Sequence, residues 1–169
     1  PLEVIRAVRA AVGPDYPISM RICGSDFIPG SNTNAEWAAF APLAEAAGVD
    51  MLNVTVGWHE SRVPQITGEV AWGGLTYTGK AIREAVRIPV AIGGRVNRPE
   101  TAEEVLALGY GDLVTMGRAM LADAEWANKA AEGREDEIRP CMGCNQGCLA
   151  NTFFDRPITC LVNPLCGTH

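Results

Sequence analysis

Long apolar runs are absent from this sequence of 169 residues, and no stretch approaches the roughly 20 apolar residues that a membrane-spanning helix needs. The first residues also lack the basic and then apolar pattern of a signal peptide. Basic residues are few, with 14 Lys and Arg against 20 Asp and Glu, and they form no run. We therefore expect neither nucleic acid nor a membrane as a partner, and we expect a cytoplasmic location. The composition does not decide whether the protein forms a homo-oligomer.

The sequence contains no G-x-G-x-x-G and thus no dinucleotide-binding fingerprint of its own. Disorder is excluded as the dominant state, because 47% of the residues are hydrophobic and only 20% are charged. The chain opens at Pro1 in a helical pattern, with Val4, Ile5, Val8 and Val12 on one face. We therefore expect the natural N-terminus to lie upstream.

Apolar runs alternate with helical patterns as far as about Asp123, which is typical of βαβ units and a parallel sheet. Each run is short and mostly apolar, as expected for a strand buried on both faces. Strands are predicted over residues 18–23, 51–56, 89–92 and 113–116. Helices are predicted over residues 34–47, 78–86, 99–108 and 125–137.

Two features refine this α/β prediction. Pro42 removes a backbone donor and crowds the preceding turn, so we expect a kink or a break in its helix. Residues 46–52 and 107–113 both follow the order helix, Gly, Asp, strand, with Gly48 and Gly109 as left-handed caps. This weak repeat favours a (β/α)8 barrel, although any α/β protein can contain such turns.

Cysteine is almost absent from the first 140 residues, where only Cys23 occurs, and the other five lie within residues 141–166. This crowding favours metal binding over a disulfide scaffold. The spacing C-x2-C-x3-C-x11-C is formed by Cys141, Cys144, Cys148 and Cys160. Four thiolates suit a [4Fe–4S] cluster, but they also suit tetrahedral Zn²⁺ or could remain free, and Cys166 is extra in each case.

We place a domain boundary near Ile138, with barrel units over residues 1–137 and a cluster-binding segment over residues 138–169. The second segment has little periodicity, so a metal centre would have to supply much of its stability. Gly143 and Gly147 would let the backbone wrap closely around such a centre.

In a (β/α)8 barrel, reactive groups gather at the carboxyl ends of the strands, and phosphates bind near strands 7 and 8. If the last two predicted strands are 7 and 8, their ends carry Gly93, Gly94, Arg95, Met116, Gly117 and Arg118. Glycines allow close approach to a phosphate, and guanidinium groups neutralise its charge. Taken singly, these residues would also fit plain turns and surface ion pairs.

Two further side chains are candidates at this face. Arg21 lies inside the first apolar strand, where a buried charge is costly unless it meets a ligand or an internal acid. His59 follows the second strand in Trp58-His59-Glu60. A lone histidine is more often structural than catalytic, so both roles stay open for His59.

The cysteine segment over residues 141–149, Cys-Met-Gly-Cys-Asn-Gln-Gly-Cys-Leu, is continued by Ile-Thr-Cys-Leu-Val-Asn-Pro over residues 158–164. It resembles the cluster segment of the 2,4-dienoyl-CoA reductase and trimethylamine dehydrogenase group within the old yellow enzyme family. The upstream motifs follow that family's order, so the resemblance covers essentially the whole chain. It implies the second half of an FMN-binding TIM barrel, and a [4Fe–4S] cluster rather than zinc.

The resemblance also implies roles for residues. The glycines and arginines at the last two strand ends, with Met116, would bind FMN and its phosphate. Arg21 would lie beneath the flavin ring and stabilise its reduced, anionic form. His59 would face an acyl thioester carbonyl, with Glu60 and Arg62 as further candidates for substrate contacts.

The function implied is an NADH:flavin oxidoreductase that reduces unsaturated, 2,4-dienoyl-type acyl-CoA. NAD(P)H would reduce FAD on further domains beyond residue 169, and the cluster would pass single electrons to FMN. We would expect this chain to be inactive alone. An amine dehydrogenase and an aryl-CoA reductase remain alternatives within the family, and an electron carrier or zinc module formed by the tail is the alternative of another class.

Overall fold

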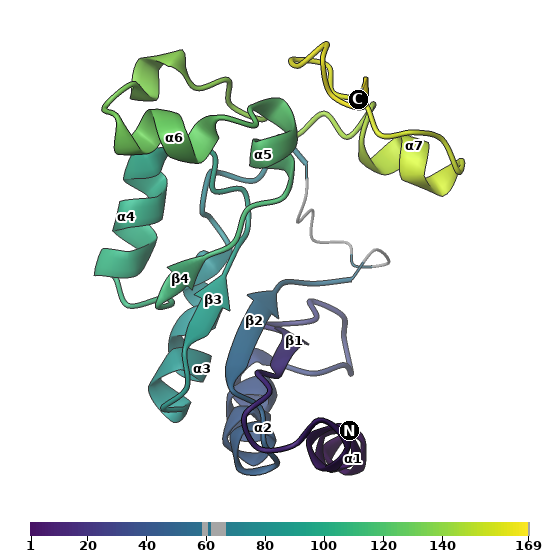
Figure 1. The fold of residues 1–169 in the computed structure, drawn as a ribbon, viewed down its shortest axis with the longest axis vertical. Coiled ribbons are helices and arrows are strands. Elements are labelled where there is room, and N and C mark those ends of the chain that lie inside the picture. Colours follow the sequence, from purple (N-terminus) through teal and green to yellow (C-terminus); the bar gives the residue numbers. More distant parts are fainter. Residues whose placement is uncertain (59–60, 62–66, 169) are drawn as a thin grey trace.

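The computed structural model describes residues 1–58, 61 and 67–168, which form an α/β fold around one parallel sheet (Figure 1). The strand order is β1-β2-β3-β4, and each neighbouring pair is parallel. The strands are β1 Ser19–Cys23, β2 Met51–Thr55, β3 Val90–Ile92 and β4 Leu113–Val114. Sequential parallel strands joined through helices are the repeating unit of a (β/α)8 barrel, so the predicted fold class is confirmed.

Helices connect the strands and cover the sheet. The α-helices are α1 Leu2–Val12, α2 Asn34–Ala46, α3 Gly79–Ala85, α4 Pro99–Ala107, α5 Arg118–Ala122, α6 Trp126–Ala131 and α7 Leu149–Phe153. Two 3₁₀ turns, η1 Thr76–Thr78 and η2 Glu135–Glu137, complete the regular structure of the described residues. Helices α2, α3 and α4 contact β1, β3 and β4, respectively. Figure 1 shows α7 and the C-terminal segment at the opposite end of the molecule from α1.

The hydrophobic core lies between the sheet and its helices. Leu52 and Val54 on β2, Val90 and Ile92 on β3, and Ile82 on α3 are at most 1% exposed. All three residues of β3 are buried, as the continuous apolar run predicts for a strand covered on both faces. Each such aliphatic side chain contributes about 1.5–3 kcal/mol by its removal from water.

Pro42 does not split its helix, so the second of the two predicted outcomes, a kink or a break, was wrong. Helix α2 runs continuously through Pro42, and Ala41 and Ala44 on either side are fully buried against the core. A capping box between Thr33 and Glu36 satisfies donors at the start of the helix. Packing and capping thus outweigh the lost backbone hydrogen bond.

The prediction of one helix over residues 125–137 was wrong, because the helix is shorter. Helix α6 ends at Ala131, and Gly133 adopts a left-handed φ of 69° before the 3₁₀ turn η2. Glycine adopts this conformation readily and interrupts a helix. The short helices α5 and α7 were not predicted, because each has a single turn and too few residues to show a period.

The two predicted glycine caps are confirmed, with φ of 110° at Gly48 and 68° at Gly109. Helix α1 exists, but Val4, Val8 and Val12 on its apolar face are 67%, 42% and 40% exposed. Only Ile5 of that helix is buried. Within the described ranges, no helix is both long and apolar enough to cross a bilayer.

Asp26 organises the loop that follows β1. Its carboxylate is fully buried and accepts hydrogen bonds from Ser31 Oγ at 2.6 Å, from Asn32 N and Nδ2 at 3.0 and 3.1 Å, and from Trp37 Nε1 at 3.0 Å. Burial alone would raise the pKa of Asp26, but the hydrogen bonds from Ser31, Trp37 and Trp58 outweigh it and lower the pKa to about 2. This carboxylate therefore joins the β1 loop, α2 and the segment after β2.

We expect Asp26→Asn to lower the stability of the fold, because an amide cannot accept all of these hydrogen bonds. The folded-state pKa of Asp26 lies below its ordinary value of 3.8, so the stabilisation is present above about pH 4 and is lost as the pH falls towards 2. A shift of this size corresponds to about 2 kcal/mol. Denaturant unfolding at pH 7 and at pH 3 checks this: the gap between wild type and variant should shrink at pH 3, and a constant gap would contradict it.

Candidate functional site

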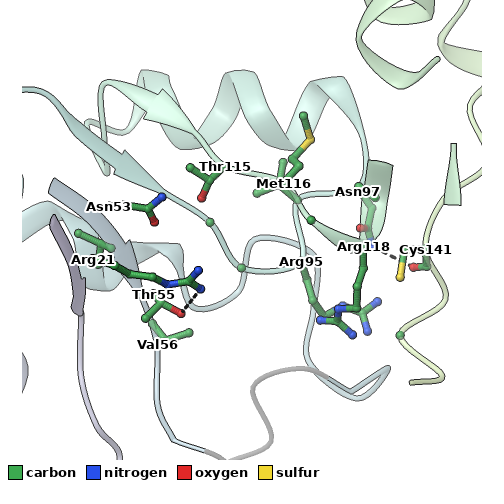
Figure 2. Close-up of a pocket in the computed structure, with 17 residues that line it drawn as sticks. Arg21, Asn53, Thr55, Val56, Arg95, Asn97, Thr115, Met116, Arg118 and Cys141 are labelled. Atoms are coloured by element: carbon green, nitrogen blue, oxygen red, sulfur yellow. Dashed lines mark hydrogen bonds between the residues drawn. The ribbon is translucent and has the colours of Figure 1, made fainter. Parts of the chain in front are cut away.

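A cavity of about 440 Å³ opens at the carboxyl ends of the strands (Figure 2). This volume is typical of a site for a cofactor or small molecule. All seven residues predicted to bind the cofactor line it, namely Arg21, Gly93, Gly94, Arg95, Met116, Gly117 and Arg118. Three consecutive strand ends and the edge strand β1 therefore bring together residues that lie far apart in the sequence.

Arg95 and Arg118 extend their guanidinium groups towards the same end of the cavity, as Figure 2 shows. Arg118 Nη1 donates to Asn145 Oδ1 at 2.6 Å, and Arg95 Nη1 donates to the carbonyl of Thr67. Two cations near one another repel unless an anion lies between or beside them. The arrangement therefore suits a phosphate monoester.

Two further features of Arg95 suit an anion-binding role. Its φ of 54° lies in the left-handed region, which is uncommon for a residue other than glycine and clusters at functional sites. Its Nε is buried, and no partner for it is found among the described residues. A buried donor without a partner costs about 1–3 kcal/mol, which a phosphate oxygen at this place would recover.

Glycine is required at one of these strand ends. A Cβ built on Gly93 would come within 2.5 Å of the Thr115 carbonyl oxygen, so a larger residue would push apart the ends of β3 and β4. Gly117 differs, because a Cβ there would meet no atom within 4 Å. Its missing side chain leaves room in the cavity instead.

Arg21 lies at the other end of the cavity, close to Asn53 and Thr55 (Figure 2). Its side chain donates to Thr55 Oγ1 at 3.2 Å. The prediction that Arg21 is a buried charge was wrong, since the residue is exposed on the open face of β1. The cavity thus has two cations at one end and a third at the other.

Several residues of the site were not predicted. Asn53 and Thr55 line the cavity from β2, Thr115 from the end of β4, and Asn97 from the loop after β3. Cys141 and Gly143 line it from the cysteine segment. Strand alternation could have identified Asn53 and Thr55, which point away from the buried Leu52 and Val54, whereas no sequence period could have placed Gly143 there.

The four predicted cysteine ligands line a second, smaller pocket, and Cys166 is not part of its wall. All six cysteines are free thiols. In the described part of the chain, no three His, Cys, Asp or Glu side chains are grouped so that they could hold a metal ion. The four cysteines are nevertheless all among the residues that line this small pocket, and Arg118 and Cys141 line the larger cavity as well.

His59, Glu60 and Arg62 lie outside the residues that the structure describes. The preceding residues reach the cavity, because Val56 lines it directly after β2. Gly57 follows with a left-handed φ of 63°, and its N–H donates to the carbonyl of Ser25 at 2.8 Å.

Cys23, on the last position of β1, is no candidate nucleophile, since burial raises the pKa of its thiol to about 11.

The fold is part of a (β/α) barrel, and its cavity lies at the carboxyl ends of the parallel strands, where the sites of barrel enzymes are found. The chain belongs to the NADH:flavin oxidoreductase / NADH oxidase family, whose model matches residues 1–137. It is thus related to FMN-dependent oxidoreductases, and the predicted membership of the old yellow enzyme family is confirmed.

Relatives match nearly the whole of this chain. It is 50% identical to a metal reductase of Desulforamulus reducens over 98% of its length, and 41% identical to an NADH oxidase of Thermoanaerobacter brockii over 99%. A solved complex of 2-naphthoyl-CoA reductase superposes with a TM-score of 0.94 and 37% identity over 99% of the chain. The chain spans 25%, 26% and 26%, respectively, of these three proteins.

We expect Arg95→Ala and Arg118→Ala each to weaken FMN binding in the full-length protein. A charge-assisted hydrogen bond contributes about 1.5–3 kcal/mol, which corresponds to roughly 10-fold to 150-fold in the dissociation constant. Fluorescence titration with FMN measures this. Arg98→Ala is a matched control, because Arg98 stacks on Trp72 at 4.6 Å and does not line the cavity. Unchanged affinity in both variants would mean that the phosphate binds elsewhere.

Proposed function

We propose that this chain forms the FMN-binding half of a barrel over residues 1–137 and a [4Fe–4S] segment over residues 138–169 of a longer NAD(P)H-dependent reductase. The observation that carries the proposal is the pair of neighbouring pockets, one lined by arginines and glycines and the other by four cysteines. When bound, FMN supplies hydride transfer and the cluster supplies single-electron transfer. FAD and NAD(P)H would bind to parts of the protein outside this chain.

Each side chain would have a distinct task. Arg95 and Arg118 would hold the FMN phosphate at one end of the cavity. Arg21, at the other end, would place positive charge where reduction builds up negative charge on the ring system. His59 would donate a hydrogen bond to a substrate carbonyl, as the resemblance of the Trp-His-Glu loop implies.

The substrate proposed is an unsaturated acyl-CoA thioester of the 2,4-dienoyl type, whose conjugated carbonyl needs such a hydrogen-bond donor. The likeness to 2-naphthoyl-CoA reductase supports a CoA thioester and favours an aromatic acyl group as the second candidate. An amine dehydrogenase of the same family would run the electrons in the opposite direction. An electron carrier or zinc module is disfavoured, because neither needs the arginine-lined cavity.

Anaerobic turnover of the full-length protein tests the substrate class. We expect NADH or NADPH to be oxidised when a dienoyl-CoA or an aryl-CoA is added, with the reduced thioester as product. The matched free acid tests whether the CoA group is recognised. Reduction of the bound flavin by a methylated amine, with no turnover of either thioester, would contradict the proposal.

A further inference from the structure

The cysteine segment is attached to the wall of the larger cavity at three places. The first is Asn97, which is only 3% exposed and lies in the loop after β3. Its Nδ2 donates to the Cys141 carbonyl at 2.9 Å, as the dashed line in Figure 2 shows. Its own backbone carbonyl accepts from Trp126 Nε1 at 3.0 Å, which fixes the position of the asparagine.

The second attachment joins Gly143 to Arg95. Gly143 is buried, has a left-handed φ of 73°, and lies between the first two cysteines of the motif. A Cβ on Gly143 would come within 2.2 Å of Arg95 Nη1 and 3.0 Å of the backbone nitrogen of Gly68. The guanidinium group of Arg95 therefore packs directly on the backbone of the cysteine turn.

The third attachment is the 2.6 Å hydrogen bond from Arg118 Nη1 to Asn145 Oδ1. Asn145 follows Cys144 and has a left-handed φ of 59°. Both cavity arginines thus contact residues located between cysteines of the motif. Arg118 and Cys141 line both pockets, so the two pockets share part of their walls.

From these contacts we propose that the cluster and the FMN phosphate bind as one coupled unit, with Asn97 as the positioning residue that couples them. The inference rests on the proposed function. A segment folded around its cluster holds Arg95 and Arg118 ready for the phosphate, so less conformational entropy is lost when FMN binds. Coupling between two sites is reciprocal, so bound FMN also retains the cluster.

A double-mutant cycle in the full-length protein measures this coupling as FMN affinity, without any assay of activity. Cys144→Ser removes a cluster ligand that lines only the smaller pocket. We expect it to weaken FMN binding by roughly 5-fold to 150-fold, the usual range of such couplings. In an Asn97→Ala background, the same substitution should weaken binding by about twofold or less. An equal effect in both backgrounds, or no effect in either, would overturn the inference.

Two further variants keep the result interpretable. Asn34→Ala is the matched control, since its amide also donates to backbone carbonyls, at 2.6 Å to Gly24 and 2.7 Å to Thr78, but contacts neither pocket. It should leave the effect of Cys144→Ser unchanged. If Asn97→Ala does not fold, Asn145→Gly removes the Arg118 contact and tolerates the left-handed backbone, and it should reduce the coupling as well.

The effect of FMN on the cluster is measured as the rate at which the protein releases iron to a chelator. This release should be several-fold slower with FMN bound than without it. Equal rates of release would also overturn the coupling. A wild-type protein that binds no FMN or holds no iron would instead refute the proposed function. If the wild-type protein binds both FMN and iron, but Cys144→Ser changes FMN affinity equally in the wild-type and Asn97→Ala backgrounds, only the coupling is refuted.

Discussion

The full-length protein carrying Cys160→Ser is expected to lose its iron and acid-labile sulfide, whereas Cys166→Ser keeps both. Cys160 lines the pocket that it shares with the other three motif cysteines, while Cys166 lies outside this wall. A serine oxygen is a hard ligand, which suits iron–sulfur clusters far less well than a thiolate. Cys166 is therefore a control of the same chemistry at a distance of only six positions in the sequence.

Anaerobic purification followed by iron, sulfide and zinc analysis measures the outcome for both variants. The cysteine segment should also become more susceptible to protease in Cys160→Ser, because its α7 is a single turn with exposed Phe153 and no large core of its own. A Cys166→Ser protein that loses its metal, while Cys160→Ser retains it, would show that the ligand set is wrong.

The second large effect is expected at His59. In the full-length enzyme, His59→Ala should slow oxidation of the reduced flavin by an enoyl-CoA substrate by roughly 100-fold to 1000-fold, the range for losing one oxyanion donor. Flavin reduction by NAD(P)H should hardly change, because in the proposed function those electrons would reach the flavin through the cluster and not past His59. Stopped-flow absorbance separates the two half-reactions.

His59→Gln is the matched variant, because its amide retains a hydrogen-bond donor of similar reach. We expect it to recover part of the lost rate. A thermal unfolding curve of each variant shows whether the fold is intact. Equal slowing of both half-reactions, or a variant that simply unfolds, would make His59 a structural residue.

The strands and the strand-end residues could be predicted from the sequence because their signals are local. Short apolar runs fixed β1 to β4 within a few residues, and the following glycines and arginines had to lie at one edge of a parallel sheet. The spacing of the cysteines likewise identified the four cysteines that line the second pocket. In each case, neighbours in the sequence carry the information.

Features that depend on distant contacts could not be predicted. In the sequence, nothing distinguishes Asn97 from an ordinary loop residue. Its hydrogen-bond acceptor, the backbone carbonyl of Cys141, is 44 positions away. Arg21 was expected to be buried because its strand is apolar, but strand alternation places it on the open face of β1, where it lines the cavity. Pro42 was expected to kink or break α2, and the burial of Ala41 and Ala44 accompanies a helix that is not broken.

The most direct test of an FMN site beside a [4Fe–4S] site is a cofactor inventory of the full-length protein purified without air. The two pockets predict about four iron, about four sulfide and about one FMN per chain, with no stoichiometric zinc. Stoichiometric zinc without sulfide, or a fully folded protein that binds no FMN, would contradict the assignment of these pockets.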